Sequence, residues 1–256
     1  MLRDAVILAA GMGTRLREDK TDVPKPLFTV GGVPLIKRTI LTLASAGITR
    51  VVVVTGYAAD QVEAALKNDA TYAEKGIQID IAYNKDFKLK NGVSVIVGGR
   101  VVNGPFALSM ADHVYTTAIA RAVASCDMSA ADLYLATDER VDNQLDIDDA
   151  TKVKTEAGRI VDIGKTIPVY DRIDCGVFAV TPRLVTELEK FLAAHGDCSL
   201  SEGVKVLASL SRARVVDIGN ETWQDVDTPA DRAHIEGQLA GGLDNVDVAS
   251  ITSTRT

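Results

Sequence analysis

The sequence predicts an α/β protein with a Rossmann-like, mostly parallel mixed sheet and helices on both faces. Three observations support this prediction. Ala5–Ala10 is a short apolar run that ends at a glycine, which is typical of a buried parallel strand. Pro34–Ala46 has the spacing of a helix with one buried face, and Val51–Thr55 is a run rich in β-branched residues. Strands that alternate with helices in this way form parallel sheets covered on both faces.

The first 138 residues continue this alternation. In the first helix, Leu35, Ile36 and Ile40 share one face, and Gly47 follows as a residue typical of a helix C-terminus. A segment that ends at Gly98-Gly99 has a pattern compatible with either a helix or an extended strand. The other elements expected here are strands at Ile77–Ala82, Pro105–Met110 and Leu133–Thr137 and helices at Ala59–Leu66 and Thr116–Ser125.

After about residue 138 the pattern changes. Glu156-Ala157-Gly158 separates two short runs, Thr151–Thr155 and Arg159–Ile163, as expected for a β-hairpin. The last helix is expected at Pro229–Leu239, with Thr228 as its N-cap and the proline in its first turn. The other elements expected here are strands at Asp174–Val180 and Ala213–Ile218 and helices at Pro182–Ala194 and Leu200–Leu210.

The composition excludes several classes of protein. The chain has 256 residues, with 28 Lys+Arg against 35 Asp+Glu and a formal net charge of −7. An acidic chain offers no broad basic face, so nucleic-acid binding is not expected. No run approaches the roughly 20 apolar residues that cross a bilayer, so we do not expect a membrane-spanning protein. The three cysteines are an odd number without metal-ligand spacing, which predicts free thiols and a cytoplasmic location.

The turn after the first expected strand contains two glycines, Gly11 and Gly13. Backbone N–H groups in such a turn can approach a phosphate closely, because no Cβ stands in the way. The dinucleotide fingerprint requires a third glycine where Leu16 stands, and the Walker pattern requires Gly-Lys-Ser/Thr where the chain has Leu16-Arg17-Glu18. Taken alone, two glycines after a strand are more often an ordinary turn.

A lysine between two prolines follows ten residues after Arg15. Pro24 and Pro26 fix their own backbone φ and restrict the residue before each, so Lys25 lies on stiff backbone. A cation in this position beside a glycine turn suits a triphosphate, because it can neutralise charge that develops on pyrophosphate with little reorganisation. An exposed loop lysine would not require two flanking prolines. The two motifs together therefore predict a triphosphate site.

The motifs Gly11-Met12-Gly13-Thr14-Arg15-Leu16 and Pro24-Lys25-Pro26-Leu27 resemble the signature of the sugar-nucleotidyltransferase superfamily. Members of this superfamily join a nucleoside triphosphate to a phosphorylated acceptor and release pyrophosphate. The resemblance extends from Ala5 to about Ile235 and implies that Arg15 and Lys25 are catalytic. It also implies that the nucleotide contacts Ala9, Ala10, Gly11, Gly13, Thr14 and Ala111.

Asn84 and the stretch Asn91-Gly92-Val93-Ser94 are candidates for nucleotide selection. Asn and Ser side chains can read a pyrimidine edge, and Ser94 could instead cap a helix; a polar turn fits the composition equally well. Cytidylyltransferases of the superfamily carry a similar Asn-x-x-Ser element, whereas thymidylyl- and uridylyltransferases usually carry Gln-x-x-Gly-type segments. The resemblance therefore implies that the nucleotide is CTP and that it contacts Asn84, Asn91, Gly92 and Ser94.

Three aspartates are candidate ligands for Mg²⁺. Asp112 follows a run that ends as a strand, where open α/β sheets bind ligands. Asp225 and Asp227 precede the last helix, and Asp227 is also a candidate to cap it. Mg²⁺ takes few protein carboxylates, so one aspartate from each segment suffices. The resemblance supports Asp112 as one of the metal ligands, and of the other two aspartates we favour Asp227. We expect His113 to be a hydrogen-bonded loop residue rather than a metal ligand.

Further stretches resemble the cytidylyltransferase domain of archaeal and thermophilic inositol-1-phosphate cytidylyltransferases, although Ala111 stands where glycine is more usual. These stretches are 110–115, 150–153, 163–165, 174–178, 200–202 and 223–228. The resemblance implies that Lys165 is a catalytic cation on the acceptor phosphate, with Lys152, Asp174 and Glu202 as further acceptor-binding residues. We expect one domain over 1–240, with a nucleotide half to about 138, an acceptor half of hairpin and helices after it, and a flexible tail over 241–256.

The expected acceptor is inositol 1-phosphate, whose phosphate oxygen attacks the α-phosphorus of CTP. Related enzymes use phosphonates or phosphocholine, but an aromatic content of 5% disfavours an aromatic cage for choline. Two other hypotheses are a sugar-1-phosphate nucleotidyltransferase that uses UTP or dTTP and a nucleotide-sensing regulatory subunit. The inositol enzymes are often fused to a membrane phosphotransferase, and we expect that partner on a separate chain. The sequence leaves the oligomeric state open.

Overall fold

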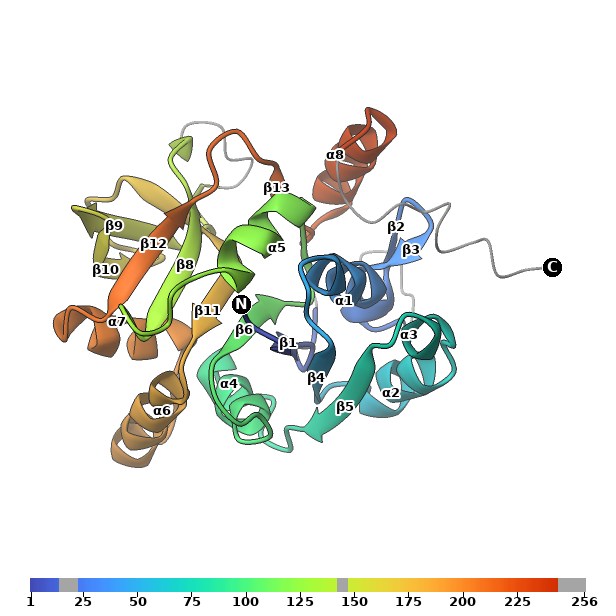
Figure 1. The fold of residues 1–256 in the computed structure, drawn as a ribbon, viewed down its shortest axis with the longest axis horizontal. Helices are drawn as coiled ribbons and strands as arrows, with labels where there is room; N and C mark the ends of the chain where they lie inside the picture. Colours follow the sequence, from blue (N-terminus) through green and yellow to red (C-terminus); the bar gives the residue numbers. More distant parts are fainter. Residues whose placement is uncertain (14–22, 142–146, 244–256) are drawn as a thin grey trace.

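The computed structural model describes residues 1–13, 23–141 and 147–243. Within these residues a nine-stranded mixed sheet has the order β5-β4-β1-β6-β11-β8-β12-β10-β9 (Figure 1). Its strands are β1 (Asp4–Leu8), β4 (Arg50–Thr55), β5 (Gln78–Tyr83), β6 (Phe106–Met110), β8 (Leu133–Asp138), β9 (Lys152–Glu156), β10 (Arg159–Gly164), β11 (Arg172–Val180) and β12 (Ala213–Asp217). The helices are α1 (Leu35–Ser45), α2 (Ala59–Lys67), α3 (Thr71–Glu74), α4 (Asn91–Gly99), α5 (Thr117–Ala124), α6 (Pro182–His195), α7 (Leu200–Ser209) and α8 (Pro229–Ala240).

Parallel pairing occurs in two parts of the sheet. β1 pairs in parallel with β4 and β6, and β4 with β5, so these four strands end at the same edge. β12 pairs in parallel with β8, whereas β9, β10 and β11 make antiparallel pairings. Because β9 pairs with both β10 and β11, the five strands from β8 to β12 close on themselves. The predicted α/β fold with a mixed sheet is confirmed, with antiparallel pairing dominant in its second half.

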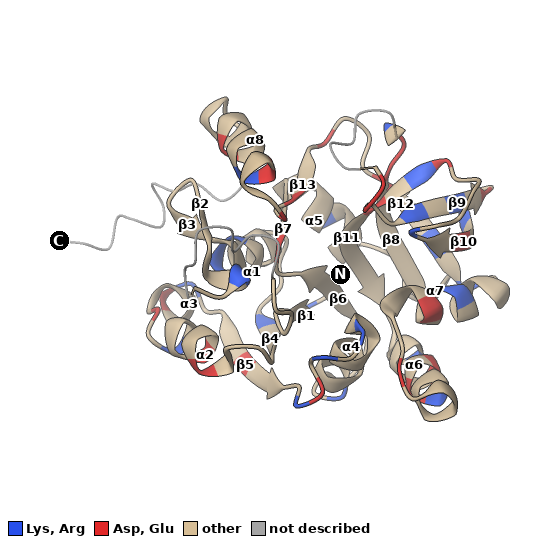
Figure 2. Ribbon diagram, turned by 180° about the vertical axis from the view of Figure 1, so that it is seen from behind, with Lys and Arg blue, Asp and Glu red and all other residues tan. Residues whose placement is uncertain are grey.

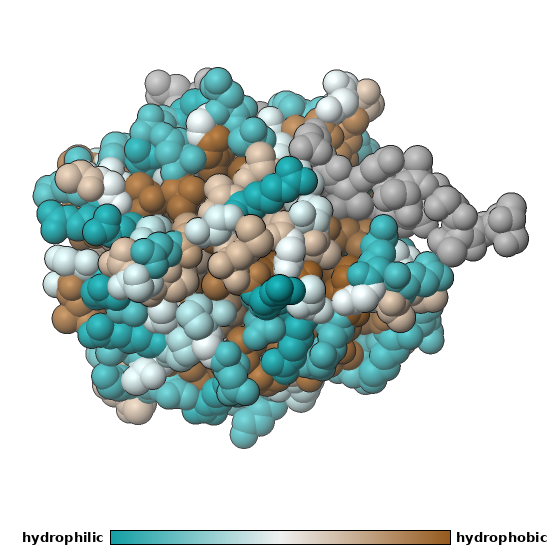
Figure 3. Space-filling view, in the orientation of Figure 1, coloured by the Kyte–Doolittle hydropathy of each residue, from teal (hydrophilic) through white to brown (hydrophobic). Residues whose placement is uncertain are grey.

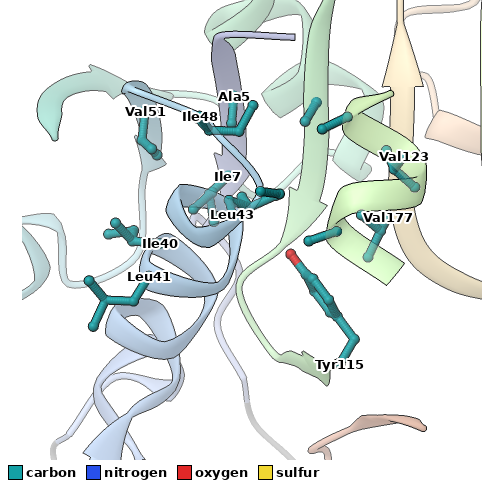
Figure 4. Close-up of a cluster of buried hydrophobic side chains, with 14 of the residues drawn as sticks. Ala5, Ile7, Ile40, Leu41, Leu43, Ile48, Val51, Tyr115, Val123 and Val177 are labelled. Atoms are coloured by element: carbon teal, nitrogen blue, oxygen red, sulfur yellow. The ribbon is translucent and has the colours of Figure 1, made fainter. Parts of the chain in front are cut away.

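Helices cover both faces of this sheet (Figure 1). On one face, Ile40 and Leu43 of α1 pack with Ile7 of β1 and Val51 of β4, as Figure 4 shows. On the other face, the neighbouring strand residue Val6 belongs to a core with residues of α4, α6 and α7. Successive residues of a strand point to opposite faces, so a strand between two cores is apolar at every position. This explains the continuous apolar run that predicts β1.

Several short elements of the structure were not predicted. They are a 3₁₀ turn at Lys25–Leu27, β2 (Thr29–Val30), β3 (Val33–Pro34), β7 (His113–Tyr115), β13 (Trp223–Asp225) and α3. β7 and β13 pair antiparallel, with Asp225 opposite His113. A small third core joins α8 to this pair through Val114, Val226 and Ile235. The segment that precedes α8 therefore lies beside the segment that follows β6.

The elements predicted from the sequence are confirmed, with end shifts of one or two residues. β1 ends at Leu8, so Ala9 and Ala10 belong to the glycine turn. Ser94 does not cap a helix, which was one of the roles that the sequence allowed, because α4 begins at Asn91 and its N-cap is Lys90. The three cysteines are free thiols, as predicted. Of the expected tail, the residues after 243 lie outside the described part of the chain.

The surface mixes hydrophilic and hydrophobic side chains. Figure 3 shows hydrophilic residues over much of one face, with hydrophobic residues between them. None of the helices in the described ranges is long and apolar enough to cross a bilayer.

Candidate active site

Two adjoining cavities lie beside the carboxyl ends of β1 and β6. The first, of about 350 Å³, is lined by the glycine turn, the start of α4 and the residues after β6. The second, of about 210 Å³, is lined by parts of β11 and β13, by the start of α7, and by the segments just before β9 and just after β10. Asn91, Met110 and Asp227 line both cavities. The cavities therefore meet at the end of β6, where Figure 2 places acidic residues near β7 and β13.

The glycine turn forms the floor of the first cavity. Ala9, Ala10, Gly11 and Gly13 line it, as expected of a turn that follows a parallel strand. Gly13 has a φ of 57°, and a Cβ at this position would stand 2.5 Å from Cβ of Lys25. Glycine is therefore required here both by the left-handed backbone and by the close approach of the lysine. Two predicted site residues, Thr14 and Arg15, lie outside the described residues.

Lys25 connects three segments of the chain. It begins a 3₁₀ turn directly after Pro24 and is only 7% exposed. Its Nζ donates a hydrogen bond to Oδ2 of Asp112 at 2.5 Å and another to Oδ1 of Asp227. Burial acts to lower the pKa of Lys25, but the charges of the two aspartates outweigh burial and raise it. Lys25 is thus a buried, charged ammonium group between two carboxylates.

Asp112 and Asp227 arrive from opposite ends of the chain. Asp112 follows β6, and its Oδ1 lies 2.8 Å from Nδ1 of His113. Burial acts to raise the pKa of Asp112, but the Lys25 ammonium and the bond with His113 outweigh it and hold this pKa well below its usual range. Asp227 does not cap α8, because Thr228 and Asp231 form a capping box there. Its carboxylate is therefore available to Lys25.

Asp225, the alternative to Asp227, faces the second cavity. Its Oδ1 accepts a hydrogen bond from Nε2 of Gln224 at 3.0 Å, and burial raises its pKa. The structure thus brings Asp112 together with Asp227 at Lys25 and places Asp225 in the second cavity. In the described ranges no group of three or more His, Cys, Asp or Glu is arranged to hold a metal ion by itself.

Of the predicted nucleotide-selecting residues, Asn91, Gly92 and Ser94 lie at the start of α4, and Asn84 directly follows β5. Asn91 and Ser94 line the first cavity, as does the predicted contact Ala111. Asn84 does not line it; it is buried and donates a hydrogen bond from Nδ2 to Oγ of Ser94 at 2.9 Å. Gly92 does not line it either, because it packs against the chain at Cys198, where a Cβ would stand 2.6 Å from the carbonyl oxygen. Asn84 thus holds a residue that lines the cavity, whereas Gly92 packs on the segment before α7.

Two of the predicted acceptor residues line the second cavity. Lys165 lies on its rim, with Nζ 2.5 Å from Oδ1 of Asp149. Asp174 lies at a bulge in β11 and accepts a hydrogen bond from the backbone N–H of Gly176 at 2.7 Å. Burial raises the pKa of Asp174 to about 6, although this hydrogen bond and the nearby His113 act against the shift. The cavity thus combines a cation with carboxylates.

The other two predicted acceptor residues are placed elsewhere. Lys152 is only 8% exposed, and its Nζ donates hydrogen bonds to the carbonyl oxygens of Asp148, Ala150 and Lys165 at 3.2, 3.3 and 2.9 Å. These contacts connect the segment before β9 to the segment after β10. Glu202 forms the capping box of α7 with Ser199, so its carboxylate is used at the helix start. Neither residue is among those that line the second cavity, and their acceptor roles stay predictions.

Three residues of the second cavity were missed as site residues from the sequence. The rings of His113 and Trp223 are nearly parallel, at 15°, with centroids 5.9 Å apart. Gly176, with a φ of 72°, lies against the His113 ring, where a Cβ would stand 2.4 Å from Cδ2. The pKa of His113 is raised: burial acts to lower it, but the hydrogen bond and the charge of Asp112 outweigh burial. The expected hydrogen bond of His113 is present, with Asp112 as the partner. For the contact between Gly176 and His113, the available signal was a glycine inside the expected strand Asp174–Val180.

Comparison with known proteins identifies the family of the chain. Residues 5–213 match the family model described as a MobA-like NTP transferase domain, which includes the glycine turn, Lys25 and Asp112. The chain belongs to this family. The match ends before Asp227, so that the second carboxylate at Lys25 comes from a segment outside the matched range.

Relatives of this MobA-like NTP transferase are similar over nearly all of its length. A bifunctional IPC transferase and DIPP synthase of Rubrobacter xylanophilus is 34% identical over 93% of the chain, and one of Archaeoglobus fulgidus is 36% identical over 95%. The chain spans about half the length of these relatives, 52% and 46%. The structure of the inositol-1-phosphate CTP transferase from T. maritima superposes with a TM-score of 0.81 at 28% identity, covering 94% of this chain and 98% of that one.

Proposed function

We propose that this MobA-like NTP transferase is a cytidylyltransferase that transfers CMP from CTP to inositol 1-phosphate and releases pyrophosphate. The observation that carries the proposal is the position of Lys25, whose ammonium contacts Asp112 and Asp227 where the two cavities meet. A nucleotide in the first cavity and an acceptor in the second would react at this junction. The inositol-1-phosphate CTP transferase named above supports the choice of both substrates.

The first cavity is assigned to CTP. Backbone N–H groups of Gly11 and Gly13 would contact the phosphates, since no Cβ blocks their approach. Asn91 and Ser94 would read the cytosine edge, with Asn84 fixing the Ser94 hydroxyl through the hydrogen bond between them. On sequence grounds, Thr14 and Arg15 would complete this site. In this proposal residues 1–138 bind the nucleotide and most of the acceptor site comes from 139–240 of the same domain.

Mg²⁺ is the proposed cofactor, with Asp112 and Asp227 as its ligands. The donor set fits this ion, because both carboxylates contact the same nitrogen of Lys25 and are therefore close enough to share one cation. Two protein carboxylates suit an ion that takes its other ligands from phosphate oxygens and water. When bound, the ion supplies charge that screens the triphosphate and the departing pyrophosphate.

The proposed reaction is an in-line displacement at the α-phosphorus. A phosphate oxygen of the acceptor forms the new P–O bond while the bond to the β-phosphate breaks, and the electron pair leaves with pyrophosphate. The nucleophile is already anionic, so this chain needs no general base; its task is to align two polyanions and reduce their repulsion. Lys25 and Arg15 do so on the nucleotide side and Lys165 on the acceptor side. Loss of one such contact raises the barrier by about 3–4 kcal/mol, by analogy with oxyanion donors.

The second cavity is assigned to the acceptor. Lys165, on its rim, would contact the acceptor phosphate, and its pairing with Asp149 keeps the flexible side chain near the cavity. Asp174 and Asp225, which also line this cavity, would accept hydrogen bonds from acceptor hydroxyls. A polyol phosphate uses both features, because it combines a dianionic group with several hydroxyl donors.

A pyrophosphate-release screen tests the proposal. The purified chain is offered CTP, UTP, dTTP, ATP or GTP with Mg²⁺, each against inositol 1-phosphate, a sugar 1-phosphate, phosphocholine or an aminoalkylphosphonate. We expect rapid release only with CTP and inositol 1-phosphate. A preference for UTP or dTTP would overturn the cytidylyl assignment, and a preference for another acceptor would overturn the inositol assignment. Nucleotide binding without release against every acceptor would indicate a regulatory protein instead.

A further inference from the structure

Asp138, at the end of β8, is a buried carboxylate that lines neither of the two cavities. It is 3% exposed. Its Oδ2 accepts a hydrogen bond from Nε1 of Trp223 at 3.0 Å and one from Nη2 of Arg140 at 2.9 Å. Its Oδ1 accepts from Nε of Arg140 at 2.8 Å. The forked contact with one arginine fixes the plane of the carboxylate and so the direction from which it can accept the indole N–H.

Arg140 also connects β8 to the segment that leads into β13. Its Nη2 donates a hydrogen bond to the carbonyl oxygen of Glu221 at 2.6 Å. The carboxylate of Glu221 in turn accepts a hydrogen bond from the hydroxyl of Thr116 at 2.6 Å. The backbone before Trp223 and the edge of its ring are therefore fixed by one pair of residues, Asp138 and Arg140.

The Trp223 ring links this pair to the acceptor cavity. It lines that cavity and stacks on His113, which is hydrogen-bonded to Asp112. Asp225, two residues further along β13, lines the same cavity. A side chain that contacts a ligand is precise only when its own rotamer is fixed by neighbours. Here Asp138 accepts from the indole N–H, the His113 ring stacks on the indole, and the indole is partly buried against the core that contains Tyr115.

We propose that Asp138, fixed by Arg140, is a positioning residue that orients Trp223 as an aromatic wall of the acceptor cavity, and that this wall selects a ring-shaped polyol phosphate over an open-chain one. The inference rests on the proposed function and extends it to specificity. The flat apolar face of a saturated six-membered ring packs well on an aromatic surface, while its hydroxyls at the edge reach Asp174 and Asp225. An open-chain acceptor such as glycerol 3-phosphate offers the phosphate and hydroxyls but no such face.

Fluorescence tests the contact directly, because Trp223 is the one tryptophan in the sequence. Inositol 1-phosphate is titrated into the wild-type chain without CTP, with glycerol 3-phosphate and inorganic phosphate as the other arms. We expect a saturable change in emission with inositol 1-phosphate and a change at least about fivefold smaller with the other two. Equal changes with all three, or none with any, would overturn the proposal. This readout does not depend on turnover, so it also decides the matter if the chain transfers no CMP.

Kinetics of two variants test the positioning role. Trp223→Leu removes the ring, and we expect it to raise the KM for inositol 1-phosphate about tenfold while the KM for CTP changes less than about twofold. Asp138→Asn keeps the size but loses the charge that holds Arg140, and we expect an intermediate rise of about fivefold. Trp223→Phe keeps a ring without the N–H and should restore part of the acceptor affinity. The ratio of kcat/KM between inositol 1-phosphate and glycerol 3-phosphate should fall in the same order.

Asp132→Asn is the matched control for Asp138→Asn. Asp132 lies just before the other end of β8, is 8% exposed, and also accepts hydrogen bonds from arginines, Arg183 and Arg212. We expect this variant to lose stability as Asp138→Asn does but to keep the acceptor KM and the wild-type emission. If both variants change the acceptor KM equally, or if neither does, Asp138 has only a structural role and the proposal fails. Absence of pyrophosphate release from the wild type with every acceptor would instead count against the proposed function.

Discussion

Gly176 lies directly against the ring of His113: a Cβ at position 176 would stand 2.4 Å from Cδ2 and 2.6 Å from Nε2 of the imidazole. The backbone at Gly176 has a φ of 72°, in the region that favours glycine. Any larger residue here both strains β11 and displaces His113 from Trp223 and Asp112. Two requirements thus converge on one glycine in the wall of the acceptor cavity.

The first prediction follows from this contact. We expect Gly176→Ala to lower the free energy of unfolding by about 1–2 kcal/mol through its left-handed φ, and also to lower kcat/KM for the acceptor by about tenfold or more. Urea unfolding and steady-state kinetics measure the two effects. Gly196→Ala is the control, because Gly196 has a φ of 78° with no heavy atom of the described residues within 4 Å of its Cβ position. The control should lower the free energy of unfolding but keep the wild-type kcat/KM for the acceptor. An equal loss of kcat/KM in both variants would contradict the placement of Gly176 in the wall of the acceptor cavity.

Replacement of Lys25 should affect chemistry as well as folding, because it leaves Asp112 and Asp227 without the cation that they share. We expect Lys25→Met to lower kcat by a factor of about 10²–10³, since a buried charge contact at the reacting phosphates is lost. Lys37→Met is the matched control: Lys37 is also largely buried and pairs with Asp69 at 2.7 Å, but on α1 and not in either cavity. The control should keep its turnover number. Near-normal turnover in Lys25→Met would show that the assigned role is wrong.

The two hairpin lysines should behave in opposite ways. Lys165→Ala is expected to raise the KM for the acceptor about tenfold or more with little change in stability, because its ammonium is half-exposed at the cavity rim. Lys152→Ala is expected to lower the free energy of unfolding by about 1–3 kcal/mol, because it leaves three carbonyl oxygens without their donor. Thermal unfolding and acceptor titration separate the two effects. The reverse outcome would restore Lys152 as the acceptor contact.

The pH dependence of stability should carry a contribution from Asp174. Its pKa is about 6 in the folded chain, because of burial, and an unfolded aspartate has a pKa of about 3.9. Between these values the folded state binds more protons, so the free energy of unfolding falls as the pH rises from about 4 to about 6 and then stays lower. Asp174→Asn removes this slope. We expect the variant to match the wild type at pH 4 and to exceed it by about 2 kcal/mol at pH 7.5 in urea unfolding.

The opposite result would contradict this account of Asp174. A variant less stable than the wild type at pH 7.5 would mean that the carboxylate is stabilised as an anion in the folded chain. The depressed pKa of Asp112 acts in the other direction, because its stabilising effect is present above the unfolded pKa and is lost as the pH falls below about 4. The comparison is therefore best restricted to pH 4 and above.

The sequence predicted most of the fold because the elements of this chain carry local signals. β1 and β4 are continuous apolar runs because both faces of each strand are buried. α1 has helical spacing of apolar residues because one of its faces packs on the sheet. Lys25 was also predictable, since two prolines mark its stiff backbone. The short pair β7 and β13 was not, because its residues lie about 110 positions apart and each strand has only three residues. Pairing over such distances leaves no periodic pattern.

The contacts of individual site residues were harder to predict from the sequence, for reasons that differ between residues. Ser199 and Glu202 carry the Ser-x-x-Glu spacing of a capping box, a signal that favours a structural role and was available in the sequence. Lys152 and Lys165 lie on the same hairpin, but only tertiary contacts decide that one reaches carbonyl oxygens and the other a cavity. The hydrogen bond from Trp223 to Asp138 joins residues 85 positions apart and has no local signature.

The most direct test of the central claim is a ³¹P NMR spectrum of the reaction of the wild-type chain with CTP, inositol 1-phosphate and Mg²⁺. The account predicts that the three CTP resonances disappear as pyrophosphate forms together with two coupled diphosphate resonances, which belong to a product that joins CMP to inositol phosphate. The same mixture with Lys25→Met should remain almost unreacted over that time. Formation of CMP and pyrophosphate without a diphosphate product, or no consumption of CTP by the wild type, would contradict the claim.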